Sequence, residues 1–133
     1  MASLPAQAEA APPKVLVVED EPGLRFVISD VLTNDHGFVV LEAASADQAL
    51  EALAHDPDIK CMFTDVRMPG KLDGIALSRR VLHDRPDIKV LITSGHLSSG
   101  EALENVPFVA KPYDLTQVAD LIQELVKSFR PRD

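Results

Sequence analysis

The chain has 133 residues, 46% of them hydrophobic and 26% charged, and its formal net charge is −8 at pH 7. This length and composition suit one globular domain with a sizeable core, and the negative charge argues against a nucleic-acid interface, which needs a basic surface. No apolar run approaches the roughly 20 residues of a membrane-spanning helix, and the N-terminus lacks the basic start and apolar core of a secretory signal.

Five short runs rich in apolar and β-branched residues predict strands. They follow a tail at residues 1–13 that is rich in Ala and Pro, shows no periodicity and is predicted to be disordered. In chain order, the predicted strands cover residues 14–18, 37–43, 59–64, 88–93 and 106–110.

A helix is expected after each strand. The first should begin at Pro22, and the second at the capping-box pattern "SADQ", residues 45–48, with Pro57 stopping it. The apolar face of the first helix should consist of Leu24, Val27, Ile28, Val31 and Leu32. The later helices are expected over 74–84, as a short and weak segment over roughly 98–104, and from a cap at Asp114 to about Phe129.

The order of these elements indicates a three-layer α/β domain. Strands without strict polar–apolar alternation imply a sheet covered on both faces, and crossover helices imply parallel strands joined by right-handed connections. We therefore expect one domain over residues 14–129, with a short tail at 130–133. The sequence "PDIK" occurs at 57–60 and at 86–89, and each copy marks a helix stop followed by a strand start.

Cys61 is the only cysteine of the chain, so no internal disulfide can form. It lies in the apolar run "CMF", and we interpret it as a small core residue rather than a nucleophile. Together with the missing secretory signal, this indicates a cytoplasmic protein.

Polar side chains stand where the predicted strands end, and open parallel α/β sheets bind their ligands at this edge. No chemistry is assigned to the end of the second strand, where Glu42 stands. The other strand ends carry Glu19, Asp20 and Glu21, then Asp65, then Ser94 and Gly95, and finally Lys111. If the first and third strands are neighbours, Asp20 and Asp65 converge.

These residue types together suit phosphoryl transfer. Converging carboxylates need a cation between them, or one of them takes up a proton. Oxygen ligands suit Mg²⁺, a lysine suits a phosphate group, and a serine hydroxyl can donate a hydrogen bond to a phosphoryl oxygen. An aspartate in such a site can itself become an acyl phosphate.

Four motifs, in order, resemble the receiver domain of two-component response regulators. They are "VLVVEDEP" (15–22), "DVRMPGKLDG" (65–74), "LITSG" (91–95) and "FVAKPY" (108–113). The resemblance runs from Lys14 to about Phe129 and implies a doubly wound, flavodoxin-like (βα)5 receiver fold with strand order 2-1-3-4-5. Relative to the family, the loop "RMPGKLDG" has one extra residue, as in receivers linked to hybrid kinases, and the short interval between Ser94 and Lys111 implies a short or irregular fourth helix.

The resemblance also implies the roles of the reacting residues. Asp65 is the expected phosphoacceptor, Ser94 the switch hydroxyl and Lys111 the lysine that pairs with the phosphoryl group. The bond between Lys111 and Pro112 should be cis, as in this family. Phe108 occupies the position of the switch aromatic, which moves inward when Ser94 engages the phosphoryl group.

The resemblance further implies a Mg²⁺ site beside the phosphoacceptor. Asp20 and Asp65 would bind the ion directly, Glu19 mainly through water, and Arg67 through its backbone carbonyl. The side chains of Arg67 and His96 occupy positions that tune the lifetime of the phosphoryl group in the family.

Taken alone, each of these residues has a simpler interpretation. Glu19–Glu21 can be a solvated charge run at a helix start, Asp65 a turn cap, and Ser94–Gly95 an ordinary turn. Lys111 can be a surface lysine and Phe108 a core residue. Arg67 and His96 can be solvated side chains. We favour the functional interpretation because the acids, the serine and the lysine stand together at the ends of four strands.

The expected function is that of a single-domain response regulator, with the starting Met and the natural-looking tails taken as signs of a complete chain. It would accept a phosphoryl group from a sensor histidine kinase or a histidine phosphotransfer protein, and signal by protein–protein contact or phosphate shuttling. It would catalyse only its own phosphorylation and dephosphorylation, so we do not class it as an enzyme.

Two other functions remain as alternatives. A Mg²⁺-dependent phosphatase or phosphotransferase of the haloacid dehalogenase type usually carries a second acid two residues after its nucleophile, where this chain has Arg67. A flavodoxin-like binder needs a phosphate-cradling loop after the first strand, where "EDEPG" is acidic. Turnover of a small phosphate ester would support the first alternative, and a yellow purified protein the second.

Overall fold

The structure, a computed structural model, describes residues 12–68, 70–95 and 106–128. Five parallel strands form one sheet in the order β2-β1-β3-β4-β5. The strands are β1 (Lys14–Val18), β2 (Val39–Ala43), β3 (Ile59–Asp65), β4 (Lys89–Ser94) and β5 (Phe108–Ala110). The strand order is the one that the resemblance to receiver domains implied.

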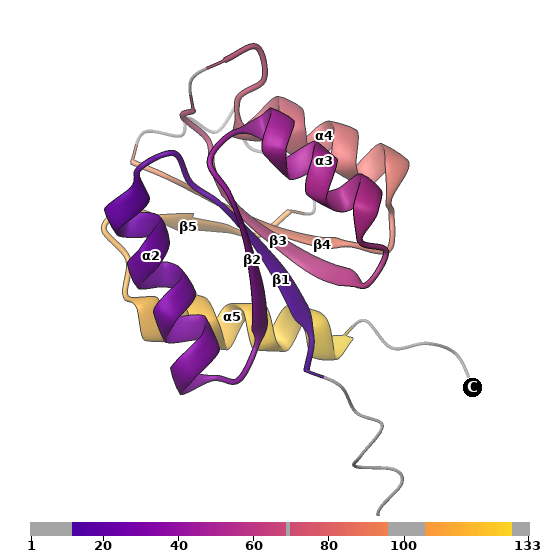
Figure 1. Cartoon of the computed structure of the whole chain (residues 1–133). Helices are drawn as coiled ribbons and strands as arrows, with labels where there is room; N and C mark the ends of the chain where they lie inside the picture. Colours follow the sequence, from indigo (N-terminus) through magenta and orange to yellow (C-terminus); the bar gives the residue numbers. More distant parts are fainter. Residues whose placement is uncertain (1–11, 69, 96–105, 129–133) are drawn as a thin grey trace, which may run out of the picture.

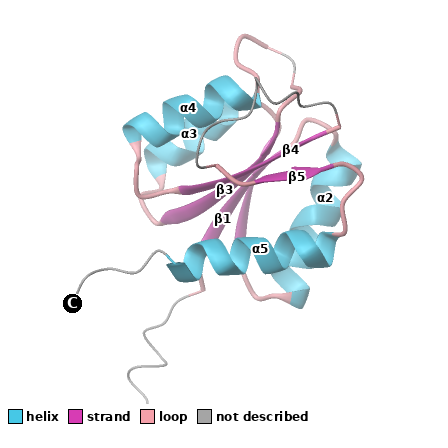
Figure 2. Ribbon diagram, turned by 180° about the vertical axis from the view of Figure 1, so that it is seen from behind, coloured by secondary structure: helices cyan, strands magenta, loops and turns pink. Residues whose placement is uncertain are grey.

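Helices cover both faces of this sheet (Figures 1 and 2). Figure 1 shows α3 and α4 on one face and α2 and α5 on the other. Their bounds are α2 (Pro22–Asp30), continued by a π-helical turn η1 (Val31–Asp35), then α3 (Ala46–His55), α4 (Gly74–Asp84) and α5 (Leu115–Ser128). None of the helices in the described parts of the chain is both long and apolar enough to cross a membrane.

The core consists of two layers, one on each side of the sheet. Leu16 and Val18 of β1 pack towards α3 and α4, whereas Val15 and Val17 of the same strand pack towards α2 and α5. Successive side chains of a strand point to opposite faces of the sheet, so a strand that is apolar throughout buries side chains in both core layers. Cys61 belongs to the second layer, where burial raises the pKa of its thiol to about 12, so the prediction of an unreactive core residue is confirmed.

Some predicted boundaries and faces differ from the structure. The second strand begins two residues later than predicted, at Val39, and the fifth begins at Phe108. Val27 is 45% exposed, so its assignment to the buried face of the first helix is wrong, whereas Ile28 and Leu32, predicted on the same face, are buried in the core. The reason is that the core-facing stripe of α2 is narrow and follows a four-residue spacing. The predicted fourth helix, over roughly 98–104, and Phe129 lie outside the described residues.

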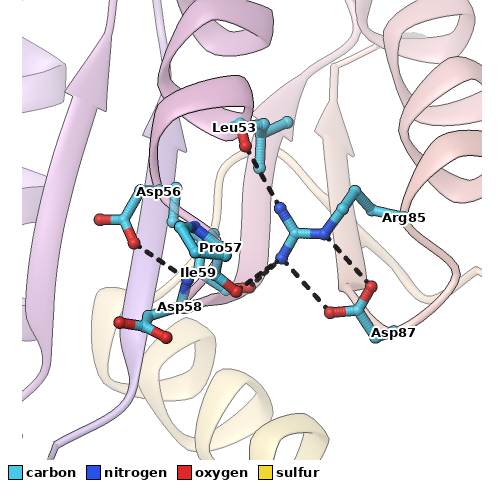
Figure 3. A network of polar contacts seen from close by, with 7 residues as sticks. All are labelled: Leu53, Asp56, Pro57, Asp58, Ile59, Arg85 and Asp87. Carbon is cyan, nitrogen blue, oxygen red and sulfur yellow. Dashed lines mark hydrogen bonds and ion pairs between the residues drawn. The ribbon is translucent and has the colours of Figure 1, made fainter.

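The two copies of "PDIK" meet at the amino edge of the sheet, where Arg85 joins them (Figure 3). Its Nη2 atom donates to the carbonyl oxygens of Pro57 at 3.0 Å and Ile59 at 3.2 Å, and its Nη1 atom donates to Leu53 at 3.3 Å. Asp87 accepts two further bonds from the same guanidinium. The residue before the second "PDIK" therefore ties it to the first and to the end of α3.

Candidate functional site

The strand register brings four of the predicted site residues to the opposite, carboxyl edge of the sheet. Val18, the last residue of β1, pairs with Thr64, so Glu19 continues alongside Asp65. Asp65 pairs with Thr93 of β4, and Ser94 pairs with Ala110, directly before Lys111. Parallel strands end at the same edge, and here β1, β3, β4 and β5 each deliver one of the expected side chains.

Asp65 lies at the centre of this edge as a buried carboxylate. Its Oδ2 atom lies 2.7 Å from the ammonium nitrogen of Lys111, and its Oδ1 atom accepts a hydrogen bond from the backbone N–H of Arg67 at 3.3 Å. The side chain of Asp65 is 8% exposed and that of Lys111 32% exposed. The carboxylate of Asp65 therefore has both of its oxygen atoms engaged, one by a cation and one by a backbone N–H.

Two backbone features position Lys111. Its N–H donates to the carbonyl oxygen of Ser94 at 3.1 Å, which extends the pairing of β5 with β4 by one residue. The peptide bond between Lys111 and Pro112 is cis, as the resemblance implied. The lysine therefore starts from the edge of the sheet and reaches across β4 to the end of β3.

Gly74 is a site residue to which the sequence analysis gave no role. Its N–H donates to the carbonyl oxygen of Val66 at 2.7 Å, so α4 begins directly against the chain that follows Asp65. A Cβ atom here would overlap with the carbonyl oxygen of Asp65 and lie 2.8 Å from its carbonyl carbon. Only glycine allows this approach, and the motif "DG" was the available signal.

Glu19 is held in place by its backbone and by its side chain. Its N–H donates to the carbonyl oxygen of Ala43 at 3.0 Å, and its Oε2 atom accepts from the N–H of Glu21 at 3.0 Å. Burial raises the pKa of Glu19, and the charges of Asp65 and Asp20 raise it further, while the N–H of Glu21 and the charge of Lys111 act in the opposite direction. The protein thus keeps a buried carboxylate next to two others, with one lysine to balance them.

This arrangement fits a Mg²⁺ ion better than a metal that needs a cage of protein ligands. Among the described residues, no group of three or more acidic, histidine or cysteine side chains is placed to enclose a metal by itself. Mg²⁺ keeps several waters and uses one or two carboxylates. The buried Glu19 and Asp65 and the exposed Asp20 supply oxygen atoms, and a cation beside them would offset both the burial of Glu19 and the repulsion from Asp65 and Asp20 that raise its pKa.

The remaining predicted residues differ in what the structure says of them. Ser94 is buried at the end of β4, and Arg67 is exposed beside Asp65. Phe108 is 38% exposed at the start of β5, so the interpretation as a core residue is wrong, while its role as a switch stays a prediction. His96 lies outside the described residues.

Tyr113 is a second neighbour that sequence reasoning missed. Its ring packs edge-to-face on Phe63 of β3, with ring centres 5.9 Å apart. Burial, followed by the charges of Glu19 and Asp65, raises the pKa of its phenol to about 12. The hydroxyl is buried and has no hydrogen-bond partner among the described residues. The phenol stays neutral and forms an apolar wall next to Lys111.

Residues 15–123 match the family model described as the response regulator receiver domain. The chain belongs to this family. The matched region starts in β1 and ends in α5, so it includes the sheet, except for Lys14, and the carboxyl edge with its site residues.

The curated relatives of this chain are larger proteins, and the chain matches only a part of each. The chain is 34% identical over 109 residues to the C4-dicarboxylate transport transcriptional regulatory protein DctD of Rhizobium meliloti, which covers 78% of the chain and 23% of that protein. It is 34% identical over 120 residues to the sensor kinase CckA of Brucella abortus, covering 85% of the chain and 12% of that protein. The chain therefore spans a quarter or less of the length of these two relatives.

Solved structures agree with the fold. A response regulator receiver protein from Pseudomonas putida is 30% identical, with a TM-score of 0.78 and coverage of 86% of this chain and 98% of that one. A receiver protein from Sinorhizobium medicae has a TM-score of 0.81 at 24% identity, with coverage of 90% and 98%, and supports the fold alone. The receiver fold is thus shown by sequence and by structure.

Proposed function

We propose that this receiver domain accepts a phosphoryl group on Asp65 from a phosphohistidine of a sensor histidine kinase or a histidine phosphotransfer protein, in a Mg²⁺-dependent reaction. Receiver domains of two-component systems accept phosphoryl groups, and the chain is one of them. The observation that carries the assignment to Asp65 is its pairing with Lys111 at 2.7 Å at the carboxyl edge of the sheet. Asp65 combines burial, a cation and a position at a strand end.

The reaction would run as an in-line displacement at phosphorus. One carboxylate oxygen of Asp65 forms a bond to phosphorus while the bond between phosphorus and the donor's imidazole nitrogen breaks. The electron pair of that bond stays on the imidazole, which returns to its neutral form after taking up a proton. The product is an aspartyl phosphate, and the ammonium group of Lys111 moves from Oδ2 of Asp65 to a phosphoryl oxygen.

Mg²⁺ would be held by Asp20 and Asp65, by Glu19 mainly through water and by the carbonyl oxygen of Arg67. When bound, the ion neutralises charge on the phosphoryl oxygens. The residues of the chain supply the geometry. Glu19 keeps the acidic loop in place by accepting a hydrogen bond from the N–H of Glu21, and Arg67 orients Oδ1 of Asp65 by donating its own N–H.

The switch would consist of Ser94 and Phe108. Ser94 is buried two strand positions from Phe108 in the β4–β5 pair, since Ser94 pairs with Ala110. A phosphoryl group that draws the serine hydroxyl towards Asp65 leaves space that the half-exposed Phe108 ring can fill. The side chains of Arg67 and His96 would set how fast water reaches the phosphoryl group.

The apolar surface beside Lys111 supports a protein as phosphodonor. A depression of about 520 Å³ is lined by Leu24, Gly95, Lys111, Pro112 and Tyr113. Phe26, less than one turn further along α2, is 65% exposed. Large exposed apolar side chains next to a reactive group are typical of a docking surface for another protein. We place this exchange in the cytoplasm, with output by contact with a downstream protein or by passing the phosphoryl group on.

A phosphatase with an aspartyl intermediate is the alternative. It would turn over small phosphate esters, whereas a receiver catalyses only the formation and loss of its own aspartyl phosphate. The exposed Arg67 stands two residues after Asp65, where such phosphatases need an acid, so we do not expect turnover.

The proposal is tested by incubating the protein with a small phosphodonor, with and without Mg²⁺, and measuring intact mass. We expect one added phosphoryl group with Mg²⁺, and none without it or in the Asp65→Ala variant. Continuous release of inorganic phosphate from p-nitrophenyl phosphate, with no adduct, would instead support the phosphatase. The mass of the native protein in its source cells tests whether the receiver acts without an output domain.

A further inference from the structure

The carboxyl end of β2 is the strand end to which no chemistry was assigned, and Glu42 stands there. In the structure Glu42 accepts a hydrogen bond at 3.0 Å from Nε of Arg25, which lies in the first turns of α2. The same guanidinium donates from Nη1 to the carbonyl oxygen of Glu19 at 2.7 Å. Arg25 therefore joins the edge strand β2 to the loop that carries the acidic residues.

The carbonyl oxygen of Glu19 belongs to the peptide group that links Glu19 to Asp20. On its other side, Glu19 is fixed through its N–H to Ala43, the neighbour of Glu42 in β2. Both backbone groups of Glu19 are thus bonded to groups at the end of β2, one directly and one through the guanidinium. The position of Asp20 relative to Asp65 depends on these two bonds.

Electrostatic attraction to Mg²⁺ does not account for this placement. A guanidinium beside the loop disfavours the approach of a second cation, since like charges repel. A site built for electrostatic attraction to Mg²⁺ would therefore have no arginine here. Arg25 is only 20% exposed, and Glu42 satisfies its charge, so the guanidinium supplies geometry while its net charge is largely cancelled.

We propose that Arg25, held by Glu42, is a positioning residue that fixes the Glu19–Asp20 peptide so that Asp20 and Asp65 bind the same cation. The inference rests on the proposed function, because it concerns the Mg²⁺ site of the phosphoacceptor. It gives Glu42 a part in the site although Glu42 contacts neither metal nor phosphate: its carboxylate orients the planar fork of Arg25.

The sign of the effect on Mg²⁺ affinity distinguishes positioning from simple charge. If Arg25 acted only as a charge, Arg25→Met would leave the acidic loop more negative and strengthen Mg²⁺ binding. If Arg25 positions the loop, the same substitution weakens binding, by about tenfold as for other residues that orient metal ligands. Arg25→Lys keeps the charge but lacks the planar guanidinium that bonds to Glu42 and to the carbonyl oxygen of Glu19 at once. We therefore expect it to recover only part of the Mg²⁺ affinity.

The test is isothermal titration of the intact protein with MgCl₂, together with the thermal unfolding temperature of each variant without Mg²⁺. Glu42→Leu removes the partner of Nε and should weaken Mg²⁺ binding, by less than Arg25→Met does, because the bond from Arg25 to the carbonyl oxygen of Glu19 remains. Arg80→Met is the matched control, because Arg80 is an exposed arginine of α4 whose ion pair with Asp84 lies away from the loop. It should leave the affinity unchanged.

A readout specific to positioning is the amide N–H signal of Asp20 in a ¹⁵N–¹H NMR spectrum. In Arg25→Met it should shift and broaden, while the signals of the "PDIK" segments at the far edge stay in place. If Arg25→Met does not fold, Arg25→Lys and Glu42→Leu decide the question by the same readouts.

Wild-type affinity retained or increased in the folded Arg25→Met or Glu42→Leu variant, with Arg80→Met unchanged, would overturn the inference and leave the proposed function intact. A wild-type protein that binds no Mg²⁺ would overturn the proposed function, and this inference with it.

Discussion

The two edges of the sheet use the same kinds of charged side chain with opposite results. At the amino edge, Lys14 pairs with Asp56 at 2.9 Å and Arg85 with Asp87 at 3.3 Å. Each of these aspartates has a lowered pKa, chiefly because of the hydrogen bond from its basic partner. At the carboxyl edge, burial raises the pKa of Glu19. One edge is paired for stability, and the other keeps negative charge that its own lysine does not balance.

This difference indicates where the domain gives up stability for function. A fold gains nothing from a buried, poorly balanced carboxylate, so such a group is expected at a site whose cation or phosphoryl group comes from outside. The amino edge, with Arg85 bonded to three carbonyl groups and an aspartate, has no such excess. Substitutions at the two edges should therefore separate stability from chemistry.

Gly74→Ala should have the largest effect, because it should lower the stability of the carboxyl edge and also disturb its phosphorylation chemistry. The new Cβ would overlap with the backbone of Asp65 and Val66, and neither can move without displacing β3. We expect a loss of about 3 kcal/mol or more in the free energy of unfolding, measured by urea denaturation, and a loss of phosphorylation.

Gly23→Ala serves as the control for this substitution. Gly23 lies in α2, and its added Cβ would come no closer than 3.4 Å to the side chain of Glu21. We expect a change within about 1 kcal/mol, since alanine favours the helix. Equal destabilisation by both substitutions would contradict the role given to Gly74.

Arg85→Met should destabilise the protein and leave the chemistry in place. The substitution removes the donor to the carbonyl groups of Leu53, Pro57 and Ile59 (Figure 3). We expect a loss of about 2 kcal/mol in the free energy of unfolding, with the extent of phosphorylation at 20 °C unchanged. Arg80→Met, at an exposed pair, should change stability by less than about 0.5 kcal/mol. A phosphorylation defect in folded Arg85→Met would mean that the two edges are coupled.

Glu19→Gln should have the opposite effect on stability. The raised pKa means that ionised Glu19 costs folding free energy, a cost that is absent below the unfolded pKa of about 4.3 and appears as the pH rises through the higher folded value. At pH 7 the variant should be more stable by about 1 kcal/mol, a gain that disappears towards pH 4, while Mg²⁺ binds more weakly. Thermal unfolding at several pH values measures the first effect, and destabilisation at pH 7 would contradict it.

Asp87→Asn should show the smallest effect, because Asp87 is partly exposed. Its lowered pKa means that the ionised form contributes stability above the unfolded pKa of about 3.9, and that this contribution is lost as the pH falls through the lower folded value. The free energy of unfolding, measured by urea denaturation, should be a few tenths of a kcal/mol higher for the wild type than for the variant at pH 7, and the two values should converge near pH 2. A difference in unfolding free energy that grows as the pH falls would show that the Arg85–Asp87 pair does not act through the charge of Asp87.

Much of the carboxyl edge could be predicted because strand ends determine it. Asp65, Ser94 and Lys111 each follow an apolar run, and a parallel sheet brings such positions together whatever the side-chain details. Gly74 and Arg25 could not be assigned roles in this way, since theirs depend on how closely α4 and α2 approach the edge. That approach is a matter of packing between elements, which a one-dimensional pattern does not contain. Val27 was misassigned for the same reason, because a helix period alone does not give the width of its buried face.

The most direct test of the account is to locate the phosphoryl group. After incubation with a small phosphodonor and Mg²⁺, reduction with borohydride converts an aspartyl phosphate to homoserine, which peptide mass spectrometry assigns to a position. The account predicts homoserine at position 65 and unmodified aspartate at position 20. A modification at another carboxylate, or none at all in a folded, Mg²⁺-loaded protein, would contradict the assignment of Asp65 as the phosphoacceptor.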